Sequence, residues 1–171
     1  SNFITYTKHG VAESTLLKAT KVGHHYNLVN ESKDIDNGSV AAIGDRKKAD
    51  VFEAKVPAKG DKIVLILTAP KIYEEYTTKM QEESNFYNGK GEVMRAYGIQ
   101  DTDRFTLSTE AFNSEAELAV GKYVFVDGTG FKLTTGEKPN MTEYGFVGHF
   151  YEVAANGRYR IWVDKNAQVY A

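Results

Sequence analysis

The second half of the chain alternates short apolar runs with turn residues. From Glu92 to Asp164 strand-like segments follow one another at intervals of roughly 8–15 residues, a spacing typical of strands joined by tight turns. The segments are GEVMRAYGI, RFTLSTEAF, GKYVFVDGTGFKLTTG, YGFVGHFYEV and GRYRIWVDK. The pattern predicts a mainly β fold, a compact barrel or sandwich of short antiparallel strands.

Two turn dipeptides in this region predict hairpins. Asp127-Gly128 separates the apolar run 123–126 from the run 131–133. Asn156-Gly157 separates 150–153 from 159–163 in the same way. Both dipeptides suit the two central positions of a hairpin turn, which require a positive φ.

The first half of the chain also has the pattern of β-strands. Strand candidates occupy 25–29, 39–43 and 51–56, and turn residues at 57–61 precede the run Ile63–Leu67. This last run is the least polar in the chain. We therefore expect it to form a central strand with both faces covered.

The hydrophobic period changes after Thr68-Ala69-Pro70. Ile72, Tyr76 and Met80 recur at four-residue spacing, and Asn88-Gly89 supplies a stop. The pattern predicts one amphipathic helix over about 70–87, packed on the β core through a single apolar stripe.

The chain is expected to form one domain with a loose start. At 171 residues it is long enough for a core of its own, and residues 21–171 are predicted to form a single β-rich domain. Residues 1–20 are a candidate N-terminal arm that becomes ordered against a partner. The alternative is a short strand or helical turn packed on the same domain.

Composition excludes several classes of function. With 21 basic and 23 acidic residues the net charge is −2, which provides no overall field to attract nucleic acid or an anionic membrane. The absence of cysteine excludes disulfides, thiolate catalysis and Cys-ligated metals. The longest apolar run, Ile63–Leu67, is far too short to span a membrane, and no membrane partner is expected.

Candidate metal ligands are present but poorly arranged. His24 and His25 are adjacent, so in a strand they point to opposite faces. The acidic run Asp34–Gly38 resembles the start of a calcium loop, yet Ser39 replaces the required glycine and Asp45 the required glutamate. No metal site and no cofactor are predicted.

Candidate catalytic carboxylates lie in turns. Asp101 and Asp103 flank Thr102 between two strands, where such residues commonly hydrogen-bond the local backbone. The chain contains no GxSxG, HExxH or P-loop pattern. No catalytic residue is assigned, and the protein is predicted not to be an enzyme.

One strand combines basic and aromatic residues. Arg158, Tyr159, Arg160 and Trp162 are the strongest candidates for a nucleic-acid face, or for a carbohydrate-binding one. Tyr159 shares a face with Ile161 and Val163, whereas the two arginines share the other face with Trp162. The charge balance disfavours nucleic acid, and a sheet with one buried face explains the same residues.

The order of segments resembles a known type of virion protein. An apolar strand, KIVLILTAP, leads into the acidic, aromatic segment KIYEEYTTKMQEESNFYNGKG. GEVMRAYGIQDTDRFTLSTEAF, VGKYVFVDGTGFK, FVGHFYEV and YRIWVDK follow. Over about residues 20–165 the chain is similar to small head-associated proteins, capsid decoration or cement proteins, of tailed phages or prophages of Gram-positive bacteria.

The resemblance implies a mechanical function. It implies a structural protein that is made in the cytoplasm of the host bacterium, binds the major capsid protein on the outer head surface and forms homo-oligomers, commonly trimers. A phage tail or receptor-binding module, or a carbohydrate- or nucleic-acid-binding β domain, is the alternative. Candidate partner-binding residues are Phe3, Ile4, Tyr6, Tyr73, Phe86 and Tyr87.

Overall fold

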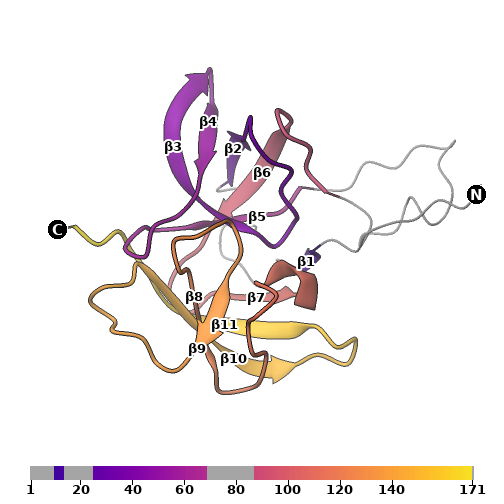
Figure 1. The fold of residues 1–171 in the computed structure, drawn as a ribbon, viewed down its shortest axis with the longest axis vertical. Helices are drawn as coiled ribbons and strands as arrows, with labels where there is room; N and C mark the ends of the chain where they lie inside the picture. Colours follow the sequence, from indigo (N-terminus) through magenta and orange to yellow (C-terminus); the bar gives the residue numbers. More distant parts are fainter. Residues whose placement is uncertain (1–9, 14–24, 69–86, 171) are drawn as a thin grey trace, which may run out of the picture.

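Two β-sheets lie one above the other in the computed structural model, which describes residues 10–13, 25–68 and 87–170 (Figure 1). One sheet closes into a five-stranded barrel and the other has six strands. Within the described ranges the single helical element is the 3₁₀ turn η2 (Thr109–Ala111). The predicted mainly β fold is therefore confirmed.

The barrel is built from the first half of the chain and β6. Its strands follow the order β2-β4-β3-β5-β6, and β6 closes the barrel by pairing with β2. All neighbours are antiparallel except β2 and β4, which are parallel. The strands are β2 (His25–Val29), β3 (Val40–Lys48), β4 (Val51–Lys55), β5 (Val64–Ile66) and β6 (Val93–Gly98).

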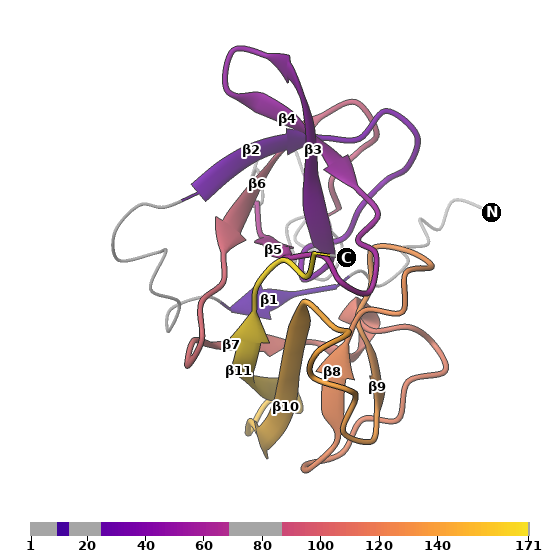
Figure 2. The same ribbon diagram turned by 90° about the vertical axis from the view of Figure 1, so that its left-hand side faces the viewer.

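The six-stranded sheet is entirely antiparallel and has the order β1-β7-β11-β10-β8-β9 (Figure 2). Its longest strands, β10 and β11, form a hairpin at its centre. The strands are β1 (Ala12–Glu13), β7 (Arg104–Leu107), β8 (Tyr123–Phe125), β9 (Thr134–Gly136), β10 (Phe146–Val153) and β11 (Tyr159–Asn166).

Strand β5 is buried on both faces, as its apolar run predicts. Leu65 points into a cluster that extends into the six-stranded sheet. Val64 and Ile66, on the opposite face, belong to the barrel interior. The run is uniformly apolar because its two faces serve two separate cores.

The core between the sheets draws on both of them. Phe105, Phe146 and Phe150 enter it from the six-stranded sheet and are at most 1% exposed. Val40 and Leu65 enter the same cluster from the barrel. The two sheets therefore bury one another, and neither core face would be covered if they separated.

The end of β11 is fastened to the barrel through the side chain of Asn166. Its Oδ1 accepts a hydrogen bond from the N–H of Ile63 at 3.0 Å, and its Nδ2 donates to the carbonyls of Ile63 and Ile99 at 2.9 Å each. All three bonds are buried. A single amide thus satisfies polar backbone groups beside β5 and β6.

The described part of the N-terminal region belongs to the sheet. The N–H of Val11 donates to Ser108 Oγ at 2.8 Å, and the N–H of Ser108 donates back to the Val11 carbonyl at 2.9 Å. Strand β1 then pairs with β7. The rest of the candidate arm, residues 1–9 and 14–20, lies outside the described residues.

Two predicted hairpins can be compared with the structure, whereas the predicted helix cannot. The hairpin at Asn156-Gly157 is confirmed, because Val153 pairs with Tyr159 across it. A hairpin around Asp127-Gly128 is also present, because β8 and β9 pair antiparallel, but the predicted partner strand 131–133 is wrong: Phe125 pairs with Thr134 across a longer connection. The helix over about 70–87 lies outside the described residues, apart from Tyr87, which is not helical.

The longer connection after β8 has a physical cause. Phe131 and Leu133 are 9% and 0% exposed, and they enter different cores. The Phe131 carbonyl also accepts a hydrogen bond from the N–H of Val40. Burying both side chains therefore prevails over the local preference of Asp127-Gly128 for a two-residue hairpin.

Candidate functional site

A row of four side chains crosses the outer face of the six-stranded sheet. Arg104 on β7 is opposite Trp162 on β11, and Trp162 is opposite His149 on β10. His149 is in turn opposite Tyr123 on β8. We call Arg104, Trp162, His149 and Tyr123 the sheet-face row.

Strand alternation places the row on the side away from the core. The neighbours Phe105, Val124, Phe150 and Ile161 are at most 1% exposed and all belong to the cluster between the sheets. Side chains next to them in the same strands must point the other way. All four members of the row are partly exposed.

Ring contacts hold the row in place. The rings of Tyr123 and His149 are 6.0 Å apart, and the Arg104 guanidinium lies 5.6 Å from the centroid of the Trp162 ring. Tyr151, on the same face of β10, meets Trp162 edge-on at 6.3 Å. The row is thus a packed set of side chains rather than separate exposed residues.

The positive charge of Arg104 has no carboxylate partner in the part of the protein that the structure describes. No ion pair joins it to a carboxylate among the described residues, and its Nε is buried without a hydrogen-bond partner. Arginine is well suited to bidentate binding of a carboxylate or phosphate. The row therefore ends in a group that can receive an anion.

The remaining charges near the row are largely compensated. His149 Nδ1 lies 2.8 Å from Asp164 Oδ2, and Arg160 donates to Glu152 at 3.0 Å. Beside Tyr123, a hydrogen bond of 2.7 Å to Glu137 raises the pKa of Lys122 and lowers the pKa of Glu137. Arg104 is thus the member of this neighbourhood best placed to attract an acidic group.

A second group of aromatic residues flanks the row. Phe125, two residues beyond Tyr123 in β8, packs edge-on against Tyr144 at 5.1 Å. The Lys59 ammonium lies 5.9 Å from the centroid of the Tyr144 ring. Aromatic surface on this side of the sheet therefore extends past the row itself.

Most predicted partner-binding residues lie outside the described part of the chain. This applies to Phe3, Ile4, Tyr6, Tyr73 and Phe86. Tyr87 is described and is 44% exposed. It precedes Asn88, which bridges to Ile35, and so belongs to the barrel side rather than to the sheet-face row.

The candidate metal ligands do not converge. His24 lies outside the described residues, and His25 packs against Tyr97 at 6.3 Å. Asp34 and Asp36 accept hydrogen bonds from the backbone N–H groups of Lys90 and Gly10. In the ranges that the structure describes, no three acidic or histidine side chains are grouped as metal ligands.

The carboxylates at 101–103 are in a turn, as predicted. The Asp103 carboxylate accepts from the N–H of Gln100 at 2.9 Å, and the N–H of Asp103 donates to the Gln100 carbonyl. Asp103 is 1% exposed. Its position is that of a turn-stabilising group.

The residues of the predicted nucleic-acid face are divided between the two sides of the six-stranded sheet. Arg160 and Trp162 are on the outer side, whereas Tyr159 packs toward the core, 5.3 Å from Phe150. Arg158 pairs with Glu13 of β1 at 3.3 Å. Sequence analysis missed Arg104, His149 and Tyr123, although each alternates with a core residue in its strand.

Two findings complete the description of the chain. Within the described ranges, no helix has the length and apolar character that crossing a bilayer would require. Comparison with protein-family models, curated proteins and solved structures found no match.

Proposed function

We propose that this protein is a structural virion protein that binds the outer surface of a tailed-phage head and stabilises it. It acts by binding to the major capsid protein and not by catalysis. The order of its segments, which resembles that of decoration proteins, supports this proposal. The sheet-face row supplies the surface through which such binding can occur.

The composition of the row is the observation that carries the proposal. Tryptophan, tyrosine and arginine are the residues that contribute most to protein interfaces, and here they stand side by side on one partly exposed face. Arg104 adds a charge without a carboxylate partner among the described residues. The proposed capsid surface therefore presents an acidic side chain beside an apolar one.

The shared core of the two sheets suits a protein that must resist mechanical force. Their common core means that force applied at the row is resisted by the barrel as well. Many copies on a shell bind with avidity, so the interface of each copy can remain small. Homo-oligomers, of which the resemblance favours trimers, would raise avidity further.

Truncating the row should weaken capsid binding strongly. In the double variant Trp162→Ala, Tyr123→Ala we expect affinity for capsids that lack the protein to fall by at least about thirtyfold, the effect of losing one strong interface residue. Co-sedimentation with purified heads measures it. Tyr170→Ala is the matched control, because this aromatic is 86% exposed and lies apart from the row.

Two results would contradict this assignment. One is wild-type protein that does not add to heads and whose removal leaves their heat resistance unchanged. The other is a folded double variant that binds heads as tightly as the control does. Cryo-electron microscopy of the parent particle distinguishes the head from the alternative location on the tail.

The row also favours a second candidate function, a carbohydrate- or nucleic-acid-binding module. Trp162 and Tyr123 could stack on sugars or bases, and Arg104 could bind a phosphate. Saturable binding in a glycan array or an oligonucleotide titration, lost in the same double variant, would support this alternative. Binding to heads without either activity would reject it.

A further inference from the structure

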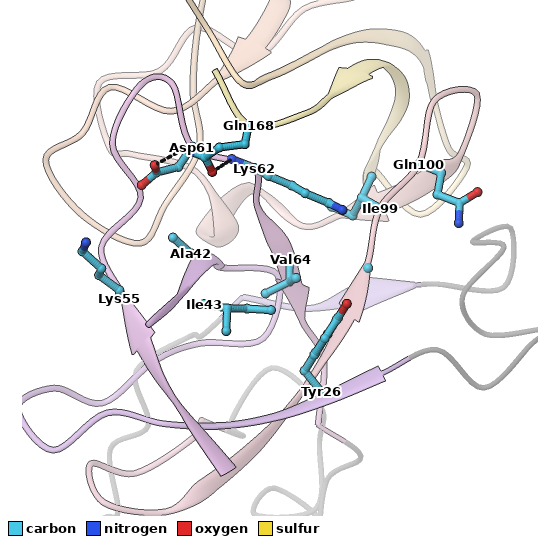
Figure 3. A pocket seen from close by; sticks show the side chains of 11 residues that line it. Tyr26, Ala42, Ile43, Lys55, Asp61, Lys62, Val64, Ile99, Gln100 and Gln168 are labelled. Carbon is cyan, nitrogen blue, oxygen red and sulfur yellow. Dashed lines mark hydrogen bonds between the residues drawn. The ribbon is translucent and has the colours of Figure 1, made fainter. Parts of the chain in front are cut away.

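The open end of the barrel contains a pocket of about 260 Å³ (Figure 3). Tyr26, Ile43, Val64 and Gly98 line it from four different strands. Ile43 pairs with the fully buried Ala54, yet it is 39% exposed itself. An apolar side chain on the interior face of a barrel is exposed in this way because the pocket opens beside it.

The pocket's floor is apolar for a structural reason. Val64 belongs to the barrel interior, and Tyr26 packs against the same cluster. Gly98 is paired with Val64 and contributes no side chain, which leaves room at the mouth of the barrel. Figure 3 shows the Tyr26 hydroxyl directed toward this space.

Two lysines stand at the rim. Lys55 and Lys62 lie on different sides of the pocket, and the Lys62 side chain extends over it toward Ile99 (Figure 3). Neither lysine forms an ion pair with a carboxylate in the described ranges. Both are exposed.

The one acidic residue of the pocket is already engaged. Asp61 Oδ2 accepts from the N–H of Ala58, and its Oδ1 accepts from Gln168 Nε2, each at 2.9 Å. The Gln168 Oε1 accepts in turn from the N–H of Lys62 at 3.1 Å. With two lysines and one aspartate, the lining carries a net charge of +1.

We propose that this pocket binds a small amphipathic anion, an apolar body that carries one carboxylate or phosphate. The apolar floor accepts the body, Lys62 extends over the pocket to meet the anionic group, and Lys55 adds positive charge from the other side. Ligand sites typically measure about 300–1,000 Å³, so a pocket of about 260 Å³ suits a small ligand. This site is additional to capsid binding, since it lies in the barrel and not on the six-stranded sheet.

Both parts of the ligand are needed. An exposed lysine contributes little to binding on its own, so an inorganic anion would gain too little from the rim. An uncharged apolar molecule would fill the floor and leave both lysines without a counter-charge. An amphipathic cation would meet the net positive charge of the lining.

Octanoate is the probe that tests this proposal, with 1-octanol and octylammonium as its uncharged and cationic counterparts. For a ligand of this size we expect octanoate to bind the whole protein with a dissociation constant of about 1 mM. Octanol should bind about fivefold more weakly, and octylammonium more weakly still. Calorimetry gives the affinities, and amide shifts at Val64 and Gly98 locate the site.

Substitutions identify the groups responsible. Lys55→Gln with Lys62→Gln should weaken octanoate binding about five- to tenfold and leave octanol binding unchanged. Lys48→Gln, also an exposed lysine of the barrel but outside the pocket lining, is the matched control. Ile43→Trp should block both ligands, because the larger side chain fills the space at a position that is already partly exposed.

Three results would overturn the proposal. They are no binding of octanoate at about 10 mM, equal affinities for octanoate and octanol, and equal octanoate affinities in the double variant and in Lys48→Gln. The outcome is separable from the capsid experiment. Protein that fails to bind heads is still expected to bind octanoate, because the row and the pocket share no residue.

Discussion

Phe150→Ala should lower the free energy of unfolding by about 3–5 kcal/mol and weaken both sheets together. Phe150 is 1% exposed, and its ring contacts Phe112 at 5.4 Å and Tyr159 at 5.3 Å. Removing it leaves a cavity in the core that Leu65 of the barrel shares. The loss should therefore extend beyond the strand that carries it.

Urea unfolding measures this effect with two probes. The fluorescence of Trp162, the only tryptophan of the chain, reports on the six-stranded sheet, and far-UV circular dichroism reports on the strands of both sheets. We expect coincident transitions in the wild-type protein and in the variant, both at lower urea in the variant.

Phe125→Ala is the matched control for Phe150→Ala. Phe125 lies in the same sheet, but on the partly exposed outer face, and its loss should cost about 1 kcal/mol. Two separate transitions, or a barrel that remains folded after the fluorescence change is complete, would contradict the shared core. They would also contradict the prediction of a single domain.

Asn166→Ala should lower the free energy of unfolding by about 3 kcal/mol. The substitution leaves the N–H of Ile63 and the carbonyls of Ile63 and Ile99 buried without partners, and each such group costs about 1–3 kcal/mol. For a chain of this length, the melting temperature should fall by about 6–12 °C. Differential scanning calorimetry measures it.

Two further variants test whether the loss of stability comes from the buried hydrogen bonds of Asn166. Gln168→Ala removes hydrogen bonds between the same chain segments, to Lys62 and Asp61, but those bonds are exposed and their loss should cost less than about 1 kcal/mol. Asn166→Asp keeps the side-chain shape and loses the donor to both carbonyls, so it should destabilise at least as much as alanine. Equal stability of Asn166→Ala and Gln168→Ala would reject this role for Asn166.

Local sequence was sufficient to predict burial where one segment is apolar throughout. The run Ile63–Leu67 is apolar throughout, and β5 within it is buried on both faces. Alternation places Leu65 and Val64 on opposite faces, but local sequence could not reveal which core each face joins. That difference depends on which strands close the barrel, and the pairing of distant strands determines it.

Local sequence predicted the wrong strand pairing after Asp127-Gly128, where contacts with distant parts of the chain determine the pairing. Gly128 does adopt a positive φ of 83°, and the Asp127 side chain accepts from the N–H of Thr129, as turn chemistry predicts. The strands nevertheless pair farther along, because Phe131 and Leu133 are buried against other parts of the chain. The sequence therefore predicts the turn and the hairpin correctly, but not which residues pair across it.

The sheet-face row could be predicted only in part. Alternation in YRIWV places Trp162 on the face away from the core, and the same rule applies to His149 within GHFY. Their position opposite one another depends on the register between β10 and β11. Tyr123 and Arg104 join them through strands that are distant in the sequence, and the pairing of such strands has no local signal.

In the part of the chain that the structure describes, the two outermost strands of the open sheet are short. There β1 has two residues and β9 has three, and the other sheet has no edge because it closes on itself. Long exposed edges let chains add strands to one another and polymerise, and short edges suppress this. Copies crowded at high local density would thus stay discrete, and their assembly would depend on side-chain surfaces and not on backbone pairing between neighbours.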